Sequence, residues 1–80
     1  MNKPNAWIIY RGSGPLAELI NNALAFYEKN YGCTPSYIRV SRCSETAAGE
    51  HVPAGCHVLG NGGTLINEVE LPLRNGEHKQ

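Results

Sequence analysis

Few side chains in this 80-residue chain have types suited to nucleophilic, acid–base or metal chemistry. Aspartate is absent, and the reactive set consists of cysteines 33, 43 and 56, histidines 51, 57 and 78, and seven glutamates. The lack of aspartate excludes Walker-type magnesium sites, EF-hand loops and aspartate-paired hydrolases. Any carboxylate chemistry must therefore use glutamate.

A zinc site is the first chemistry that these residue types suggest. Cys43, His51, Cys56 and His57 are suitable zinc ligands, and Cys33 is a further candidate. The spacing contains no Cys-x-x-Cys pair, and neighbouring strand residues such as Cys56 and His57 point to opposite faces. Cysteine is also a common small core residue. We therefore expect no metal and no cofactor.

A cysteine nucleophile is the second possibility, with Cys43 or Cys56 activated by a histidine base. If Cys56 lies in a strand, His57 projects away from it, and only His51, in a loop, remains as the base. Such Cys and His combinations arise by chance in many chains. We expect a protein without catalytic machinery.

An anion site is the third possibility, at the Gly-Ser-Gly-Pro turn of residues 12–15. Gly12, Ser13 and Gly14 allow close backbone approach at a helix N-terminus, and Arg11 supplies a forked positive charge. Neither the phosphate-binding loop motif nor the dinucleotide motif is present, and Pro15 lacks the N–H that a phosphate would use. The alternative is a turn that only caps a helix.

The elements that position these residues follow from hydrophobic periodicity. Residues 6–10 are apolar on both faces, as in a strand covered on both sides, and residues 16–31 carry an apolar stripe at helical spacing. Residues 37–42 alternate like a half-buried strand. Residues 43–55 are expected to form a long loop with one helical turn near residues 45–48.

The last two strands are predicted at residues 56–60 and 64–71, on either side of Asn61-Gly62. Asn-Gly between apolar runs favours a two-residue hairpin turn, because both central residues need positive φ. Such a hairpin would place Val58 opposite Leu65 and Cys56 opposite Asn67. Gly63 could instead add a bulge and shift this register by one residue.

The predicted fold is α+β: a β-α-β-β-β mixed four-stranded sheet, with one helix packed on one face and a C-terminal β-hairpin. Residues 1–73 form the single domain and residues 74–80 a flexible tail. Because strand–helix–strand order indicates a parallel pair, ligands would collect at the carboxyl ends of the first two strands. If the third strand is antiparallel to the second, that rim gathers Arg11, Gly12, Ser13, Gly14, Cys43, Ser44, His51, Cys56 and His57.

One helix covers only one sheet face, which leaves an apolar patch on the other. Such patches mark partner surfaces. We predict a homodimer, or docking of another protein, through the open sheet face or an edge strand, with Trp7, Ile9, Tyr37, Arg39 and Ile66 as interface residues. The alternative is that residues 43–55 fold back over the patch in a monomer.

Charge and composition limit the remaining partners. Seven basic and seven acidic residues give zero net charge, which argues against a nucleic-acid partner. Residues 1–42 hold five basic and two acidic residues, hence +3, and residues 43–80 hold two basic and five acidic, hence −3. This asymmetry could join the two halves of one chain or favour contact between molecules.

No apolar run of about 18 residues or export signal is evident, so we expect a cytoplasmic protein without a membrane partner. We predict a small binding or interaction protein that self-associates. The alternative from another class is a small-anion or ligand site, either for binding or for an enzymatic reaction, at the rim formed by residues 12–15 and 43–55.

Overall fold

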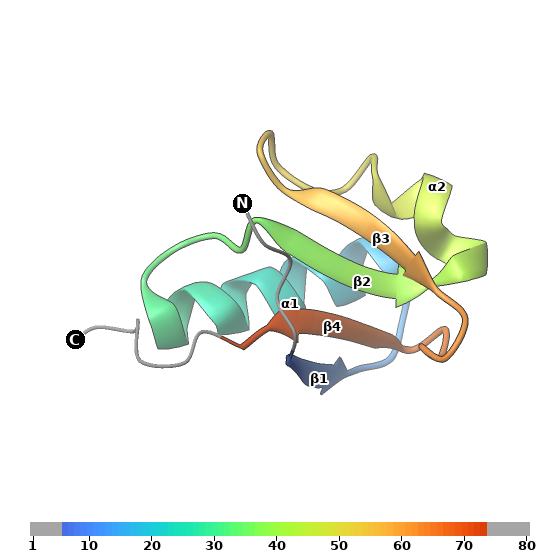
Figure 1. The fold of residues 1–80 in the computed structure, drawn as a ribbon, viewed down its shortest axis with the longest axis horizontal. Helices are drawn as coiled ribbons and strands as arrows, with labels where there is room; N and C mark the ends of the chain where they lie inside the picture. Colours follow the sequence, from blue (N-terminus) through green and yellow to red (C-terminus); the bar gives the residue numbers. More distant parts are fainter. Residues whose placement is uncertain (1–5, 74–80) are drawn as a thin grey trace.

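The computed structural model describes residues 6–73 and contains a four-stranded mixed sheet with one long helix packed against it (Figure 1). Its elements in chain order are β1 (Trp7–Arg11), α1 (Leu16–Tyr31), β2 (Tyr37–Ser41), the 3-10 helix η1 (Arg42–Ser44), α2 (Glu45–Ala48), β3 (His57–Asn61) and β4 (Glu68–Pro72). The predicted mixed α+β architecture is confirmed, including a helical turn at residues 45–48. The tail predicted at residues 74–80 lies outside the described residues.

Helix α1 has the bounds that the apolar stripe predicts. It begins at Leu16, directly after Pro15, whose carbonyl accepts a hydrogen bond from the Leu19 N–H at 3.0 Å. It ends at Gly32, which adopts a left-handed conformation with φ of 75° and donates its N–H to the Glu28 carbonyl at 2.7 Å. A residue with a Cβ would be strained at this φ. The stripe buries Leu19, Ile20, Ala23 and Tyr27.

The strand order β1-β4-β2-β3 differs from the expected one. Both β1 and β2 run antiparallel to β4, so they are parallel to each other as predicted, but β4 lies between them. The prediction that residues 6–10 form a strand covered on both faces is therefore wrong. β1 is an edge strand, and Ile9 is 52% exposed. The strand buried at every position is β4.

The chain reverses after β3 as predicted, but neither Asn61 nor Gly62 has the positive φ expected of the two-residue turn, and β3 and β4 do not pair with each other. The chain reverses beyond Asn61, so β3 and β4 run in opposite directions, yet β2 lies between them and β3 pairs in parallel with β2. Residues 62–67 form turns rather than the start of the last strand. The Asn61 side-chain amide donates to the Thr64 hydroxyl at 2.8 Å, and the Leu65 N–H donates to the Glu68 carboxylate at 3.0 Å. These local hydrogen bonds compete with strand extension.

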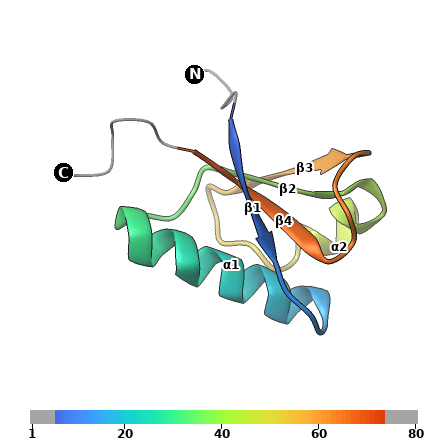
Figure 2. The same cartoon turned by 90° about the horizontal axis from the view of Figure 1, so that it is seen from below.

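The long segment between β2 and β3 lies on the same side of the sheet as α1. Ala48 and Cys56 belong to the hydrophobic core together with Ile20 and Val69. Figure 2 shows α1 and α2 on one side of the strands, and no described element on the other. The alternative that residues 43–55 cover the second sheet face is therefore wrong. Within residues 6–73 that face stays uncovered.

Candidate functional site

The uncovered sheet surface, here called the open face, faces the viewer in Figure 1. Strand register and side-chain contacts place alternate residues of all four strands on it. They are Trp7, Ile9 and Arg11 from β1, Glu68, Glu70 and Pro72 from β4, Tyr37, Arg39 and Ser41 from β2, and His57, Leu59 and Asn61 from β3.

The centre of the open face is an ion pair beneath an aromatic ring. Arg39 approaches Glu70 at 2.6 Å through Nε and at 2.5 Å through Nη2, both to Oε1. The Arg39 guanidinium carbon also lies 4.4 Å from the Trp7 ring centroid. Because the Glu70 side chain is only 8% exposed, its charge depends on Arg39 for compensation. The ring of Trp7 supports the guanidinium by a cation–π contact.

A second ion pair lies at the end of the same face. Arg11 Nε is 2.9 Å from Glu68 Oε2, and Glu68 Oε1 accepts the Leu65 N–H. The hydrogen bond from Leu65 and then that from Arg11 lower the pKa of the Glu68 carboxyl. Both ion pairs join the positive first half of the chain to its negative second half. The positive first half and the negative second half of the sequence therefore attract each other within one chain at these two ion pairs.

Four of the five predicted interface residues share the open face. Trp7 and Arg39 are stacked, Ile9 is exposed beside them, and the Tyr37 ring lies 5.4 Å from that of His57. Ile66 is not on this face: it lies in the turn before β4 and is 69% exposed.

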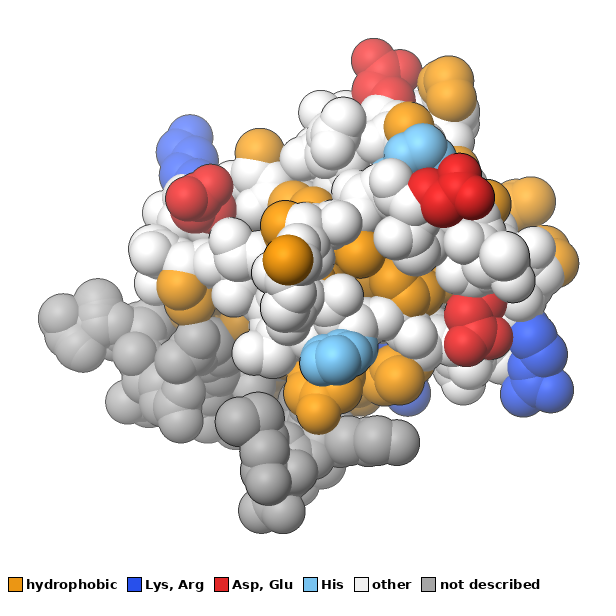
Figure 3. All heavy atoms as spheres, turned by 90° about the horizontal axis from the view of Figure 1, so that it is seen from above, with side chains coloured by type: hydrophobic (Ala, Val, Ile, Leu, Met, Phe, Trp, Pro, Cys, Tyr) orange, Lys and Arg blue, Asp and Glu red, His pale blue; other side chains and the backbone are white. Residues whose placement is uncertain are grey.

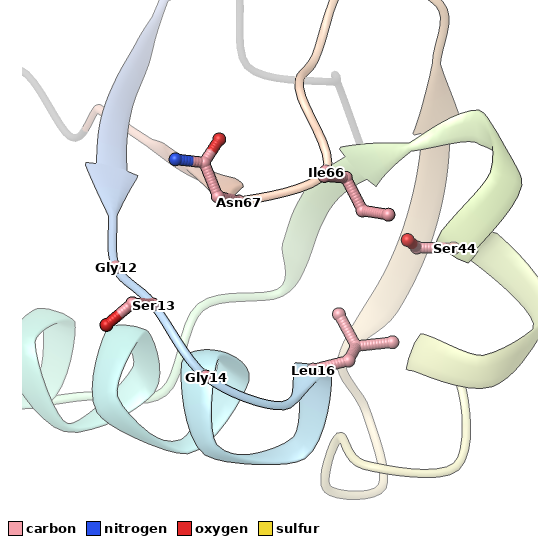
Figure 4. A pocket seen from close by; sticks show the side chains of 7 residues that line it. All are labelled: Gly12, Ser13, Gly14, Leu16, Ser44, Ile66 and Asn67. Carbon is pink, nitrogen blue, oxygen red and sulfur yellow. The ribbon is translucent and has the colours of Figure 1, made fainter.

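A separate cavity of about 400 Å³ opens at the end of the sheet where β1 and β2 finish and β4 begins (Figure 4). Its lining residues are all uncharged: Gly12, Ser13, Gly14, Leu16, Ser44, Ile66 and Asn67. A hydrogen bond from the Gly12 N–H to the Asn67 carbonyl at 3.2 Å joins two of its walls. This cavity occupies part of the predicted rim.

The predicted rim is only partly assembled. Gly12, Ser13 and Gly14 line the cavity, but Arg11 pairs with Glu68 on the open face. Cys43 is exposed, with its sulfur 3.2 Å from the Ser41 hydroxyl oxygen. Neither Arg11 nor Cys43 lines the cavity, so the forked positive charge of the anion hypothesis is missing there.

The remaining rim residues lie elsewhere because β3 is parallel to β2, not antiparallel. His57 pairs in register with Tyr37, at the opposite end of the sheet from the cavity. Cys56 precedes it and is buried in the core, where desolvation raises the pKa of its thiol. His51 follows α2 and donates its backbone N–H to the Ala48 carbonyl. Among residues 6–73, no three His, Cys, Asp or Glu side chains are grouped closely enough to hold a metal ion.

Sequence reasoning missed part of the cavity lining. Leu16 was expected only in the helix core, Asn67 in a strand, and Ile66 at an interface. Strand direction could have indicated these residues. When β4 is antiparallel to β1 and β2, the segments that follow β1 and β2 and the segment that precedes β4 lie at the same end of the sheet. Ser44, expected at the rim, does lie there.

Comparisons with known proteins found no family model, no curated protein and no solved structure that matches this chain. In the described part of the chain, no helix combines the length and the apolar character needed to cross a membrane.

Proposed function

We propose that this chain is a small binding protein without catalytic machinery, which associates with a second copy of itself through the open face. The observation that carries the proposal is the uncovered face itself, on which Trp7, Ile9, Tyr37 and Leu59 surround paired charges. Exposed apolar surface on a central sheet favours association, because burying it removes it from water.

The charge pattern supports a second copy as the partner. Each arginine on the open face already has a carboxylate partner in the same chain: Arg11 with Glu68, and Arg39 with Glu70. Two such faces can meet without bringing unpaired like charges together, which would oppose association. A strongly charged partner would gain less from a face whose charges are already paired.

The size of the face indicates how strong this association should be. Four strands of five residues outline roughly 300 Å², taking about 4.8 Å between strands and about 3.3 Å per residue. Stable interfaces bury about 800 Å² on each partner. We therefore expect a weak dimer whose population rises with protein concentration.

The two edge strands are the other places where copies could meet. β1 is an edge strand that carries the exposed Ile9, and β3 is the opposite edge. Figure 3 looks onto the β3 side, where hydrophobic side chains lie in separate groups between polar atoms. Pairing through β1 would protect its outward N–H groups from hydrogen exchange at high concentration, whereas face-to-face packing would leave them exchanging.

Sedimentation velocity from micromolar to millimolar concentration tests the proposal. The wild type should shift toward a dimer mass, and Ile9→Lys should remain a monomer, because a charge would be buried in the interface. Leu65→Lys is the matched control, since Leu65 is 58% exposed but lies off the open face, and it should behave as the wild type. A monomer at every concentration, or equal disruption by both variants, would contradict the proposal.

A further inference from the structure

We infer that the cavity between the turn at residues 12–14, η1 and the turn before β4 binds a small uncharged molecule that carries a branched aliphatic group and an amide or hydroxyl group. This inference is independent of self-association, because the cavity is lined by residues outside the open face. Its volume of about 400 Å³ lies within the range of ligand pockets, roughly 300–1,000 Å³.

Ser44 is the observation that points to a ligand. The residue is only 7% exposed, and Figure 4 shows its hydroxyl directed into the cavity. At the start of α2, this hydroxyl makes no capping hydrogen bond to the helix backbone. A hydroxyl directed into a cavity can donate a hydrogen bond to a molecule that occupies it and accept one from it, and this is how a ligand can reach Ser44.

The other walls define the ligand's chemistry. Leu16 and Ile66 supply aliphatic surface beside the Ser44 hydroxyl, whereas the side chains of Ser13 and Asn67 point away from it (Figure 4). Ser44 is therefore the polar side chain that a ligand in the cavity meets. Ile66 is 69% exposed, so a ligand would also cover part of its apolar surface. An amphipathic molecule with one small polar end matches this division.

The surroundings disfavour an anion despite the helix N-terminus nearby. No charged residue lines the cavity, and Arg11 is paired with Glu68 on the open face. Glu18, in the first turn of α1, lies so close to Gly14 that a Cβ there would be 2.9 Å from its Oε1. This carboxylate already occupies the positive end of the helix and repels a second negative charge.

The test is an NMR titration of the ¹⁵N-labelled protein with isovaleramide, which is uncharged, and with isovalerate, its anionic counterpart. Isovaleramide should saturate with millimolar affinity, as expected for so small a molecule, and should shift the amide signals of Gly12, Ser13, Gly14 and Asn67. Isovalerate should bind more weakly. Absence of saturable shifts, shifts spread over the open face, or tighter binding of isovalerate would overturn the inference.

Three substitutions connect the result to the cavity. Ser44→Ala removes the polar partner and Leu16→Ala removes aliphatic surface, and each should weaken isovaleramide binding roughly three- to tenfold. Ser36→Ala is the matched control, because Ser36 is exposed and does not line the cavity, and it should leave the affinity unchanged. Equal affinity in all three variants would show that the amide binds elsewhere and overturn the assignment.

Discussion

The side chains of β4 are buried by different means on the two faces of the sheet, and the contrast falls within five residues. Val69 and Leu71 point to the α1 side and are completely buried in the core. Glu68 and Glu70 point to the open face and are 5% and 6% exposed, with arginines from β1 and β2 as partners. One central strand is therefore buried by apolar packing on one face and by ion pairing on the other.

We expect the two faces of the sheet to contribute differently to the free energy of folding and to binding. On the α1 side, apolar surface removed from water contributes stability without any need for a partner group. On the open face, the gain from pairing is offset by the cost of removing charges from water. We therefore expect the α1 side to supply most of the folding free energy, and the open face to tolerate substitution and remain free for contacts.

The largest effect is expected from a truncation on the α1 side. Leu71→Ala should lower the free energy of unfolding by about 2–5 kcal/mol, because it leaves a cavity in a fully buried site. Urea denaturation followed by circular dichroism measures this loss. Leu65→Ala, at a position 58% exposed, should change stability by less than about 0.5 kcal/mol. Comparable losses at the two sites would remove the distinction between core and surface.

A smaller effect is expected at the central ion pair of the open face. Glu70→Ala should cost about 1–3 kcal/mol, because Arg39 then loses its partner while still partly buried. The double variant Arg39→Leu/Glu70→Leu should recover most of that loss, since no unpaired charge remains. If the double variant is much less stable than Glu70→Ala in the same urea assay, the ion pair adds more to the free energy of unfolding than its desolvation cost removes, which contradicts the expectation.

The second ion pair should show as a pH dependence. The folded protein holds the pKa of Glu68 below its ordinary value of 4.5, so its stabilising contribution is complete above that pH and is lost as pH falls through the lowered folded pKa. Wild type should exceed Glu68→Gln in stability at neutral pH, and the difference should shrink below about pH 4.5. A difference independent of pH, measured by urea unfolding at each pH, would mean that the charge of Glu68 is not involved.

The smallest effect is expected at Trp7. Trp7→Leu keeps apolar bulk on the open face but removes the ring that lies over Arg39, which should cost about 0.5–1 kcal/mol. Trp7→Phe, which retains a ring, should cost less. If thermal unfolding ranks the two variants in the opposite order, the contact stabilises through packing rather than through the ring.

Local features were predictable because each depends on neighbouring residues. The stripe from Leu16 to Tyr31 and the left-handed Gly32 define α1 with its observed bounds. The reversal beyond Asn61 was also predictable, although Asn61 itself ends β3 and the Asn-Gly pair does not adopt the positive φ of the expected two-residue turn. These signals act over a few residues, and no distant contact is needed to produce them.

Strand order was not predictable in the same way. Residues 68–72 contain two glutamates and resemble a half-exposed strand, yet they form the most buried strand, because Arg11 and Arg39 from distant segments neutralise them. Residues 6–10 are apolar on both faces and resemble a covered strand, yet they form an edge. The direction of β3 also determines which predicted residues lie at the rim. Because β3 is parallel to β2, His57 lies at the opposite end of the sheet from the cavity.

The most direct test of the account is a comparison of the NMR spectra of the ¹⁵N-labelled protein at micromolar and millimolar concentration. We predict concentration-dependent shifts at the Trp7 indole and at the amides of Ile9, Tyr37 and Leu59, with the exposed side of α1 unchanged. Spectra that do not depend on concentration, or shifts confined to α1, would contradict the claim that the open face is the surface through which this protein associates.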